Sequence, residues 1–458
     1  MIENDAFKLL LINLFHLNPD DITNIVCTTF NKMMVLLVTL ADKHQACPYC
    51  GFTAPKIKEY VTKEITHSAL TTQKCIIKYR ARRYKCPCCG KTYYEFNPFV
   101  FKSQKISILT VHNILKDLKD FNETFTSVAR RYHVSPTSVS TIFDNHVDIG
   151  RNPLPEIINF DEVYAFKSEK SKYVCVLLDF KKQIPVDVLP NRKKEYLLNY
   201  FQKIPLEERK KVKYACSDMY EVYRDVVHKV FPEAKHLLDY FHLSQDFHKK
   251  MNEVRIKVMK GYKDNKASDE YYLLKKFNWL LFKNPEDEDK HGRLFDVERE
   301  RKYNSHFKSY MNYYDLRKKL LEINNDLTIC YSLKLELVDF YSKSTIDNAK
   351  VNLENLIRSC IDTNIEEMIK FSNNLINWKQ EIINSFTIVD TEYKVEADKG
   401  QVVVCNKKVN NAIIENRNKI IKCIKNNANG YTNWSRFRNR VMYVLDPSAT
   451  FSLEPREK

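Results

Sequence analysis

The hydrophobic and polar positions divide the chain into stretches of different character. Short β-branched or aromatic runs separated by polar turns fill residues 157–191, as IINFDEVYAF, KYVCVLLDF and QIPVDVLP, and they predict three consecutive strands. A helix, a strand and another helix are expected next, over EYLLNYFQKI, VKYACSDMY and YEVYRDVVHKVF. Strands followed by alternating helix and strand indicate a mixed α/β layer.

A long stretch of the second half has the composition of helices. Between Pro285 and Pro447 there is no proline and very little glycine, while Leu, Ile, Lys, Glu and Asn are frequent. Because proline and glycine are the residues that break helices, residues 246–395 are predicted to form several packed helices. The tail after Pro447 is expected to be loose.

Composition narrows the class of partner. The chain has 74 Lys+Arg against 58 Asp+Glu, a net charge of +16, which favours a polyanion. Its 7 glycines argue against glycine-rich phosphate loops. No apolar run is long enough to span a membrane, and acids stand where a secretory signal needs basic residues, so a cytoplasmic protein is expected.

Two CPxCG sequences suggest a bound metal. Each CxxC turn directs two thiolates to one point, and two such turns complete a tetrahedral zinc site within a predicted zinc ribbon. The expected ligands of this single Zn²⁺ are Cys47, Cys50, Cys86 and Cys89. Cys75 and Cys88 are expected to be spectators, and His44 is an alternative ligand. A disulfide pair or buried thiols are the other interpretations. With four protein sulfurs the zinc would be structural.

Basic residues follow the ribbon. From Lys74 to Lys105 there are nine Lys/Arg against one acid, with tyrosines interleaved. Such a surface suits contacts to phosphates, although a solvated charged face is the alternative. The candidates for DNA contact are Arg80, Arg82 and Arg83.

Residues 124–146 predict a helix-turn-helix. Thr126 is expected to cap the first helix, and Ser135 followed by Pro136 is a typical start for the second. The second helix would bury Val139, Ile142 and Phe143. The side chains left to face a major groove are Thr137, Ser138 and Ser140, with Arg130 and Arg131 nearby. A plain packing unit is the alternative.

Two aspartates follow apolar runs that are predicted to be strands. Asp161 comes after IINF and Asp218 after VKYACS, where a carboxylate is costly unless it binds something. Acids at the ends of adjacent strands can hold divalent cations. For a single aspartate, capping a strand or starting a helix is the alternative.

A helix around Glu415 carries an unusual polar face. Helical spacing predicts one side with Ile413, Ile420, Ile421 and Ile424, and another with Asn411, Glu415, Asn418, Lys419 and Lys422. Residues 416–440 hold seven Lys/Arg, Arg436 among them, and no acid. A solvated face would mix charges more evenly, so this face is predicted to meet metal and phosphate.

The order of these motifs resembles a known family. The CPxCG pair, the helix-turn-helix, FDEV at Asp161, SDMY at Asp218 and NxxxExxNxxIKxIKxxxxGYxNWxRFRxR around Glu415 are similar to bacterial insertion-sequence transposases of the ISL3 family. That family belongs to the DDE class with an RNase H-like core. The resemblance implies that these three acids form a triad binding two Mg²⁺, or Mn²⁺. By the same likeness, LLDYFHL gives Asp239 and His242 supporting roles.

The implied protein is a multidomain α+β DNA transposase. It would bind terminal inverted repeats in double-stranded DNA, cleave strands and transfer them to target DNA, working as a homodimer when two ends are synapsed. Lys419 and Lys422 are expected to hold the phosphate backbone. A DNA-binding regulator and an RNase H-like nuclease that cleaves without joining are the alternatives.

The expected domains follow the motifs. They are an N-terminal segment (1–40), the zinc ribbon (41–98), the helix-turn-helix (100–150), the first part of an RNase H-like mixed α/β core (155–245), a helical insertion (246–400), the second part of the core with the Glu415 helix (401–446) and a tail (447–458).

Overall fold

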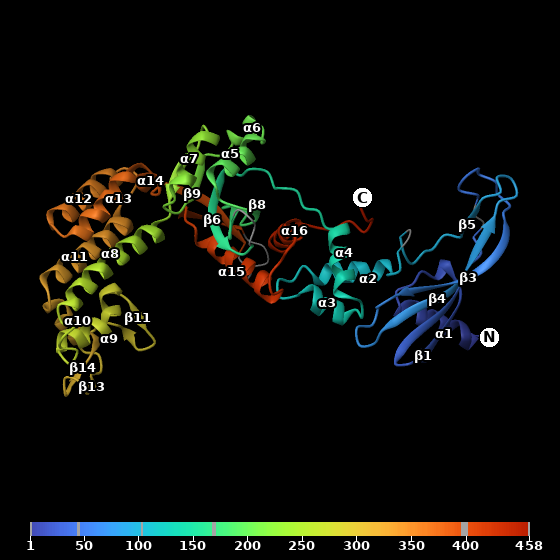
Figure 1. Cartoon of the computed structure of the whole chain (residues 1–458), viewed down its shortest axis with the longest axis horizontal. Coiled ribbons are helices and arrows are strands. Elements are labelled where there is room, and N and C mark those ends of the chain that lie inside the picture. Colours follow the sequence, from blue (N-terminus) through green and yellow to red (C-terminus); the bar gives the residue numbers. More distant parts are fainter. Residues whose placement is uncertain (1, 44–45, 102–103, 167–170, 395–401, 457–458) are drawn as a thin grey trace.

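The molecule is elongated and consists of units arranged in a row (Figure 1). A computed structural model describes residues 2–43, 46–101, 104–166, 171–394 and 402–456. From the N-terminus, an antiparallel-rich sheet is followed by three short helices, a central sheet and a large helical unit. No helix within these ranges has both the length and the apolar character needed to cross a membrane.

The N-terminal unit is a helix packed on a five-stranded sheet. Helix α1 (Ile2–Leu14) precedes β1 (Ile22–Phe30), β2 (Met33–Leu40), β3 (Lys56–Thr66), β4 (Cys75–Lys85) and β5 (Thr92–Tyr94). The strand order is β1-β2-β4-β3, with β5 paired to β4, and β2 runs parallel to β4. Strands β3 and β4 lie between the two cysteine pairs, and the strands before position 41 belong to the same sheet.

Three helices come next: α2 (Ile108–Asp117), α3 (Phe125–Arg131) and α4 (Pro136–His146). Ser135 caps α4 and Pro136 is its first residue, as the sequence predicts. The predicted cap of α3, Thr126, is wrong. Thr124 is the N-cap, because its hydroxyl accepts from the amide of Ser127 while the Ser127 hydroxyl accepts from the amide of Thr124.

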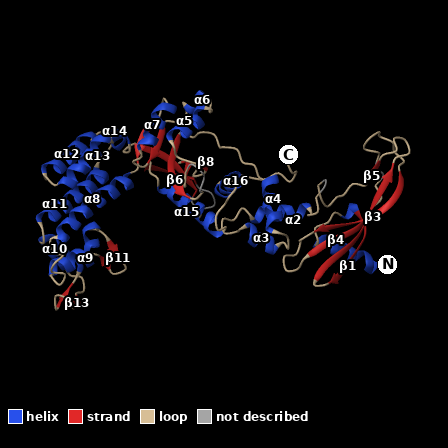
Figure 2. Cartoon of the chain, in the orientation of Figure 1, coloured by secondary structure: helices blue, strands red, loops and turns tan. Residues whose placement is uncertain are grey.

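The central unit is a mixed sheet covered on both faces (Figure 2). It contains β6 (Ile157–Tyr164), β7 (Tyr173–Asp179), β8 (Pro185–Leu189), β9 (Tyr214–Ser217) and β10 (Lys235–Leu238), in the order β10-β9-β6-β7-β8. β7 is antiparallel to β6 and β8, whereas β6, β9 and β10 are parallel. The three predicted strands and the mixed α/β layer are confirmed.

Alternate residues of β6 face different helices. Ile158 and Phe160 enter a core with α5 (Lys194–Gln202) and α7 (Glu221–Val230), next to the short α6 (Leu206–Arg209). Val163 lies in the opposite core, with α15 (Ala412–Asn427) and α16 (Trp434–Leu445). This period-two alternation also turns the odd-numbered polar residues of β6 toward α15.

The large unit between β10 and α15 is mainly helical, as predicted. It contains α8 (Tyr240–Lys260), α9 (Asp269–Lys276), the 3-10 helix η2 (Asn278–Phe282), α10 (Tyr313–Glu322), α11 (Asn325–Lys343), α12 (Ala349–Asp362), α13 (Glu366–Asn377) and α14 (Lys379–Asn384). Leucines and aromatic residues from all of these helices share one core.

The region 246–395 nevertheless contains strands at three places, which the prediction of several packed helices did not include. Two small hairpins, β11–β12 (Glu288–Asp289, Gly292–Arg293) and β13–β14 (Lys302–Asn304, Ser309–Met311), interrupt it, and β15 (Ile388–Lys394) pairs with β16 (Val402–Lys408). Gly292 has a φ of +94° at the first hairpin, a left-handed conformation that a helix does not contain.

The expectation of a loose C-terminal tail is also wrong up to residue 456. The amide of Ser452 donates to the carbonyl of His146 at 3.1 Å, and the amide of Arg456 donates to the carbonyl of Asn145 at 3.0 Å. The Arg456 guanidinium also lies 2.7 Å from the Asp148 carboxylate. The tail therefore lies along the end of α4, because backbone groups there accept and donate hydrogen bonds.

Helix α16 joins the three-helix unit to the central sheet. Arg440, 1% exposed, donates hydrogen bonds of 2.8 Å to the carbonyls of Asp120 and Glu123 between α2 and α3. The Tyr443 hydroxyl donates to the carbonyl of Leu115 at 3.0 Å. Buried polar contacts of this kind keep the two units in a fixed relation.

Candidate active site and metal centres

Three aspartates lie at the same edge of the central sheet. Asn159 of β6 pairs in register with Cys216 of β9, and Asp161 and Asp218 each follow two residues later. Asp239 comes directly after Leu238, the last residue of β10. Because β6, β9 and β10 are parallel, their carboxyl ends meet, and the two predicted acids are gathered with Asp239.

Glu415 joins these residues from helix α15. Ligand atoms of Asp239, His242 and Glu415 all lie within 4.8 Å of one another, and Nε2 of His242 is 3.9 Å from Oδ2 of Asp239. Glu415 is also among the charges that raise the pKa of Asp161. The carboxylates predicted from distant parts of the sequence thus lie on one side of the sheet, together with the two supporting residues.

Buried asparagines hold α15 against β6. Asn418 donates a 2.7 Å hydrogen bond to Oδ2 of Asp161, and Asn159 donates to Oδ1 of Asn411 at 2.7 Å. Asn411 in turn donates to the carbonyl of Phe160 at 3.2 Å. Their spacing with Glu415 along the helix was visible in the sequence, but their partners on β6 were not.

The predicted faces of this helix need correction. Ile414 is fully buried, whereas Ile413 and Ile420 are half-buried, and Asn411 and Asn418 belong to the buried side. The reason is that β6 offers partners to these amides: Asp161 accepts from Asn418, Asn159 donates to Asn411, and the carbonyl of Phe160 accepts from Asn411. Oδ1 of Asn418 is buried without a hydrogen-bond partner among the described residues.

Burial dominates the electrostatics of the site. Desolvation raises the pKa of Asp161 to about 7, and the negative charges of Asp218 and Glu415 add to the rise. Desolvation likewise raises the pKa of Asp218 to about 6, while His242 opposes that rise. The pKa of Asp239 is raised by burial as well. Carboxylates that are this close and this buried need positive charge to stay ionised at neutral pH.

The donor set fits divalent cations that prefer oxygen ligands. Oδ1 of Asp218 is buried and has no hydrogen-bond partner among the described residues. An orphaned carboxylate oxygen next to other acids is suited to a Mg²⁺ ligand. Asp161, Asp218 and Glu415, with Asp239 beside them, are the residues that can hold such ions.

The metal-free protein should become less stable as the pH rises from about 5.5 to 7.5. A carboxyl group whose folded pKa is raised stabilises the fold while it remains protonated, and this stabilisation is lost as the pH rises through the folded pKa. For Asp161, whose pKa rises from 3.8 to about 7, the loss begins above pH 3.8 and its last part falls within this range. Asp161→Asn should remove about 2 kcal/mol of it, at about 1.4 kcal/mol per pKa unit.

Urea unfolding in EDTA at the two pH values measures this difference. Glu454→Gln, which changes an exposed acid of the tail, is the control and should keep the original pH dependence. If Asp161→Asn keeps that dependence too, the raised pKa of Asp161 is contradicted.

The four cysteines predicted as zinc ligands form one cluster. Their sulfur atoms lie within 4.8 Å of one another, with 3.7 Å between Cys47 and Cys89 and 3.5 Å between Cys50 and Cys86. A tetrahedral Zn²⁺ with Zn–S bonds of about 2.3 Å places sulfurs about 3.8 Å apart. A hydrogen bond from the backbone of Cys89 lowers the pKa of Cys86 to about 7, which favours the thiolate.

Local geometry explains why these turns form. Gly51 and Gly90, which follow the cysteine pairs, have φ values of +75° and +70°. Their amides donate to the carbonyls of Cys47 and Cys86 at 2.8 and 3.0 Å. Only glycine adopts this left-handed turn without strain. Cys88 is exposed and Cys75 is buried in the neighbouring sheet, and both lie outside the cluster, while His44 lies outside the described residues.

Several basic residues predicted to contact DNA are engaged within the protein. Arg82 and Arg83 pair with Glu95 and Glu59, Arg131 pairs with Asp117 and Glu123, and Arg436 pairs with Asp144. These contacts were hidden in the sequence because the partners lie on other elements.

The other predicted DNA contacts are more accessible. Arg80, Arg130, Lys419, Lys422 and Thr137 are exposed. On α4, the hydroxyl of Ser138 shares a 2.8 Å hydrogen bond with the N-cap residue Ser135, and the Ser140 hydroxyl donates to the carbonyl of Thr137.

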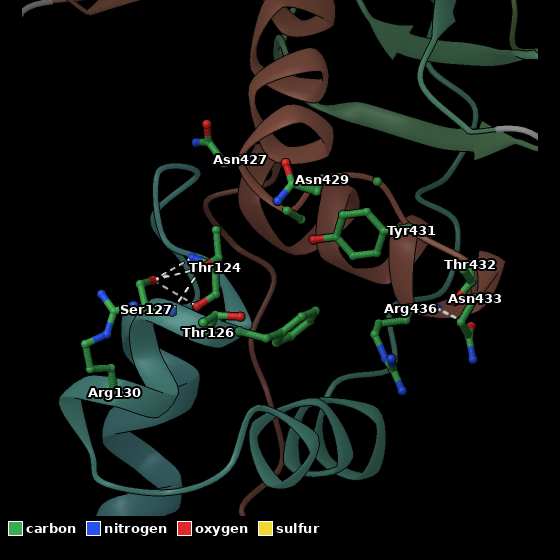
Figure 3. A pocket seen from close by; sticks show the side chains of 13 residues that line it. Thr124, Thr126, Ser127, Arg130, Asn427, Asn429, Tyr431, Thr432, Asn433 and Arg436 are labelled. Atoms are coloured by element: carbon green, nitrogen blue, oxygen red, sulfur yellow. Dashed lines mark hydrogen bonds between the residues drawn. The ribbon is translucent and has the colours of Figure 1, made fainter.

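A cavity of about 400 Å³ lies where α3 faces the loop between α15 and α16. Figure 3 shows Thr124, Ser127 and Arg130 on one side, and Asn429 and Tyr431 on the other. Its lining is largely amide, hydroxyl and guanidinium groups, which suits a polar or anionic ligand.

Comparison with known proteins gives two matches. The family model for ISL3-type DDE transposases, described as "Transposase", matches residues 158–397, just over half of the chain. The transposase for insertion sequence element IS1001 from Bordetella parapertussis is 19% identical over 409 residues, covering 89% of this chain and 90% of that protein. Asp161, Asp218, Asp239 and His242 lie inside the matched family region, and Glu415 follows it.

Proposed function

The chain belongs to the ISL3 family of DDE transposases, and from that premise we propose that it cleaves DNA at the ends of an insertion sequence and joins those ends to target DNA. The observation that carries the proposal is the meeting of Asp161, Asp218 and Glu415 on one side of the central sheet, where burial raises the pKa of Asp161 and of Asp218 and the charge of Glu415 adds to the rise at Asp161. Such a group is suited to bind divalent metal.

The central sheet supports an RNase H-like core. Strands β6 to β8 are antiparallel, and β9 and β10 run parallel to β6 on its other side. Asp161 lies within β6, and Asp218 and Asp239 directly follow β9 and β10. In this proposal the helices from α8 to α14 form an insertion within the core, and α15 returns to complete the site.

Bound Mg²⁺ or Mn²⁺, proposed as a pair, would activate the attacking oxygen and stabilise the leaving oxyanion. The protein side chains perform the remaining tasks. Asp161, Asp218 and Glu415 supply the negative charge that holds the ions. Asn418 donates a hydrogen bond to Oδ2 of Asp161, and the amide of Glu162 donates one of 2.7 Å to Oδ1. Together they fix the orientation of this carboxylate. Asp239 and His242 lie beside Glu415 as supporting residues.

We propose that the zinc ribbon and the helices α3 and α4, as a helix-turn-helix, recognise the terminal inverted repeats. Exposed Arg80, Arg130 and Thr137 are suited to contact DNA, and the polar cavity beside α3 adds hydroxyl and amide groups next to Arg130. In this proposal the arginines that are paired with carboxylates stabilise the conformation of this surface through their ion pairs; they are Arg82, Arg83, Arg131 and Arg436. Ser138 and Ser140 lie on the same helix.

Exposed Lys419 and Lys422 on α15 are proposed to hold the phosphate backbone near the carboxylates. Since two ends must be synapsed, we propose a homodimer in the active complex. Because the cleaved ends and the target are both genomic DNA in this proposal, we propose that the protein acts in the cytoplasm.

Strand joining tests the proposal. Pre-cut DNA ends with a free 3′-OH, made from the inverted repeats that this proposal expects on either side of the coding region, should be joined to supercoiled plasmid when Mg²⁺ is present. The same mixture in EDTA is the control. Nicking without joined product would indicate a nuclease, and binding with neither reaction would indicate a regulator. Either outcome would contradict the proposed function.

A further inference from the structure

A second group of metal-ligating side chains lies away from the proposed active site. His228 is in the last turn of α7, His236 is on β10 and Glu381 is on α14. Their ligand atoms all lie within 4.8 Å of one another. The three elements meet where the helical unit contacts the central sheet (Figure 1). Three chain segments thus bring two imidazoles and a carboxylate to one point.

The surroundings of His236 favour one tautomer. The Ser217 hydroxyl lies 2.9 Å from both the carbonyl of Asp218 and Nε2 of His236, and when it donates its one proton to the carbonyl it accepts from Nε2. That arrangement puts the ring proton on Nε2 and leaves Nδ1 with a free lone pair. Nδ1 is buried, the residue is 1% exposed, and Nδ1 has no hydrogen-bond partner within the described ranges.

This arrangement is typical of a metal-binding histidine. A ligating imidazole usually donates its other ring N–H to a neighbouring oxygen, which fixes the ring orientation and the tautomer. Burial also lowers the pKa of His236 to about 3, so the ring stays neutral and its lone pair remains available at neutral pH. A bare nitrogen lone pair in a protein interior is costly unless it binds a proton donor or a metal.

Glu381 supplies the negative charge. The residue is 5% exposed, and its Oε1 lies 4.0 Å from Nε2 of His228. A buried carboxylate is costly without a compensating positive charge, and a bound cation would supply it. The His228 side chain is 57% exposed, so its ring can move toward a bound ion and complete the set of ligands.

We propose that His228, His236 and Glu381 form a Zn²⁺ site, separate from the ribbon zinc and from the carboxylate site. Two histidines and one glutamate are a known donor set for zinc, with a fourth position open to water. The ion ties α14, the last helix of the helical unit, to β10 and α7. Through His236 and Ser217 it also braces the backbone at Asp218.

Metal content of the full chain tests this proposal independently of DNA cleavage. Glu415→Gln protein serves as the parent, so that the Asp239, His242 and Glu415 group does not contribute a site. After removal of loosely bound metal, the parent should retain two Zn²⁺ per chain. Adding His228→Ala should leave one, and so should Glu381→Gln, which keeps the side-chain volume. His291→Ala, which removes an exposed histidine elsewhere, is the control and should leave two.

A spectroscopic titration identifies the ligands. After a strong chelator has removed all zinc and one equivalent of Zn²⁺ has refilled the four-cysteine ribbon site, added Co²⁺ should give the visible bands of a tetrahedral nitrogen and oxygen site without sulfur charge transfer. His228→Ala should weaken Co²⁺ binding roughly 100-fold or more. Mutating a residue that only hydrogen-bonds to a ligand already lowers metal affinity by up to about 100-fold, and His228 is proposed as a ligand itself. Because His228 is exposed, the variant should keep the original circular dichroism. One zinc in the parent, or two in folded His228→Ala, would overturn the proposal.

Discussion

Glu415→Gln is expected to abolish Mg²⁺-dependent nicking of plasmid DNA while leaving DNA binding intact. Glutamine keeps the size of the side chain but removes the charge that Glu415 contributes beside Asp239 and His242. Metal stabilisation of the transition state supplies several kcal/mol, and each 1.36 kcal/mol is a factor of ten in rate, so a loss of roughly 10³-fold or more is expected. Nicking assays with a gel-shift measurement on the same samples give both quantities.

Two further variants make this result specific. Asp218→Asn should show the same loss, because Oδ1 of Asp218 is buried without a hydrogen-bond partner in the described part of the chain and has no evident structural task. Cys423→Ser changes an exposed residue on the same helix as Glu415 and should nick normally. A Glu415→Gln protein that nicks at the original rate would show that the triad is wrongly assigned.

The features that the sequence predicted correctly are those set by neighbours in the chain. Ser135 and Pro136 start α4 because capping needs only the next few residues. The cysteine pairs converge because each CxxC turn, closed by a glycine, brings its own two sulfurs together. The strands around Asp161 were recognisable because buried strands are short runs of β-branched and aromatic residues.

The features that were missed depend on partners far away in the chain. Asn418 is hydrogen-bonded to Asp161, which lies 257 residues earlier in the chain. Its buried position therefore could not follow from helical spacing alone. Arg131 and Arg436 looked available for DNA, but their carboxylate partners lie on other elements. The tail after Pro447 is expected to be loose, yet its backbone forms hydrogen bonds with the end of α4, which lies 306 residues earlier in the chain than Ser452.

The same distinction between local and distant partners explains which residues of the candidate site the sequence predicted and which it missed. Asp161 and Asp218 are predicted because a carboxylate after an apolar run is costly, and burial does raise the pKa of both. Glu415 is predicted from the polar and basic face of its helix, and it lies beside Asp239 and His242. Asp239 and His242 were identified only through the family resemblance. The second histidine group was not visible at all, because His228, His236 and Glu381 come from segments that no local pattern links.

Cys86→Ser is expected to release the ribbon zinc and to abolish end-specific DNA binding. Zinc bound to four cysteines contributes about 10–16 kcal/mol to the folding of small zinc modules, so a ribbon lacking one sulfur should lose its fixed shape. Cys86 is buried at the centre of the cluster, 3.5 Å from Cys50. Zinc release measured with a chromogenic chelator, together with binding to inverted-repeat DNA, gives the two readouts.

The chain offers a closely matched control two residues away. Cys88 is exposed and lies outside the cluster, so Cys88→Ser should keep both the zinc and the binding. Non-specific binding through the remaining basic surface should persist in Cys86→Ser, because phosphate contacts do not depend on the ribbon alone. Cys86→Ser protein that retains its zinc and still distinguishes the inverted repeat from random DNA would show that these cysteines are not the ligands on which recognition depends.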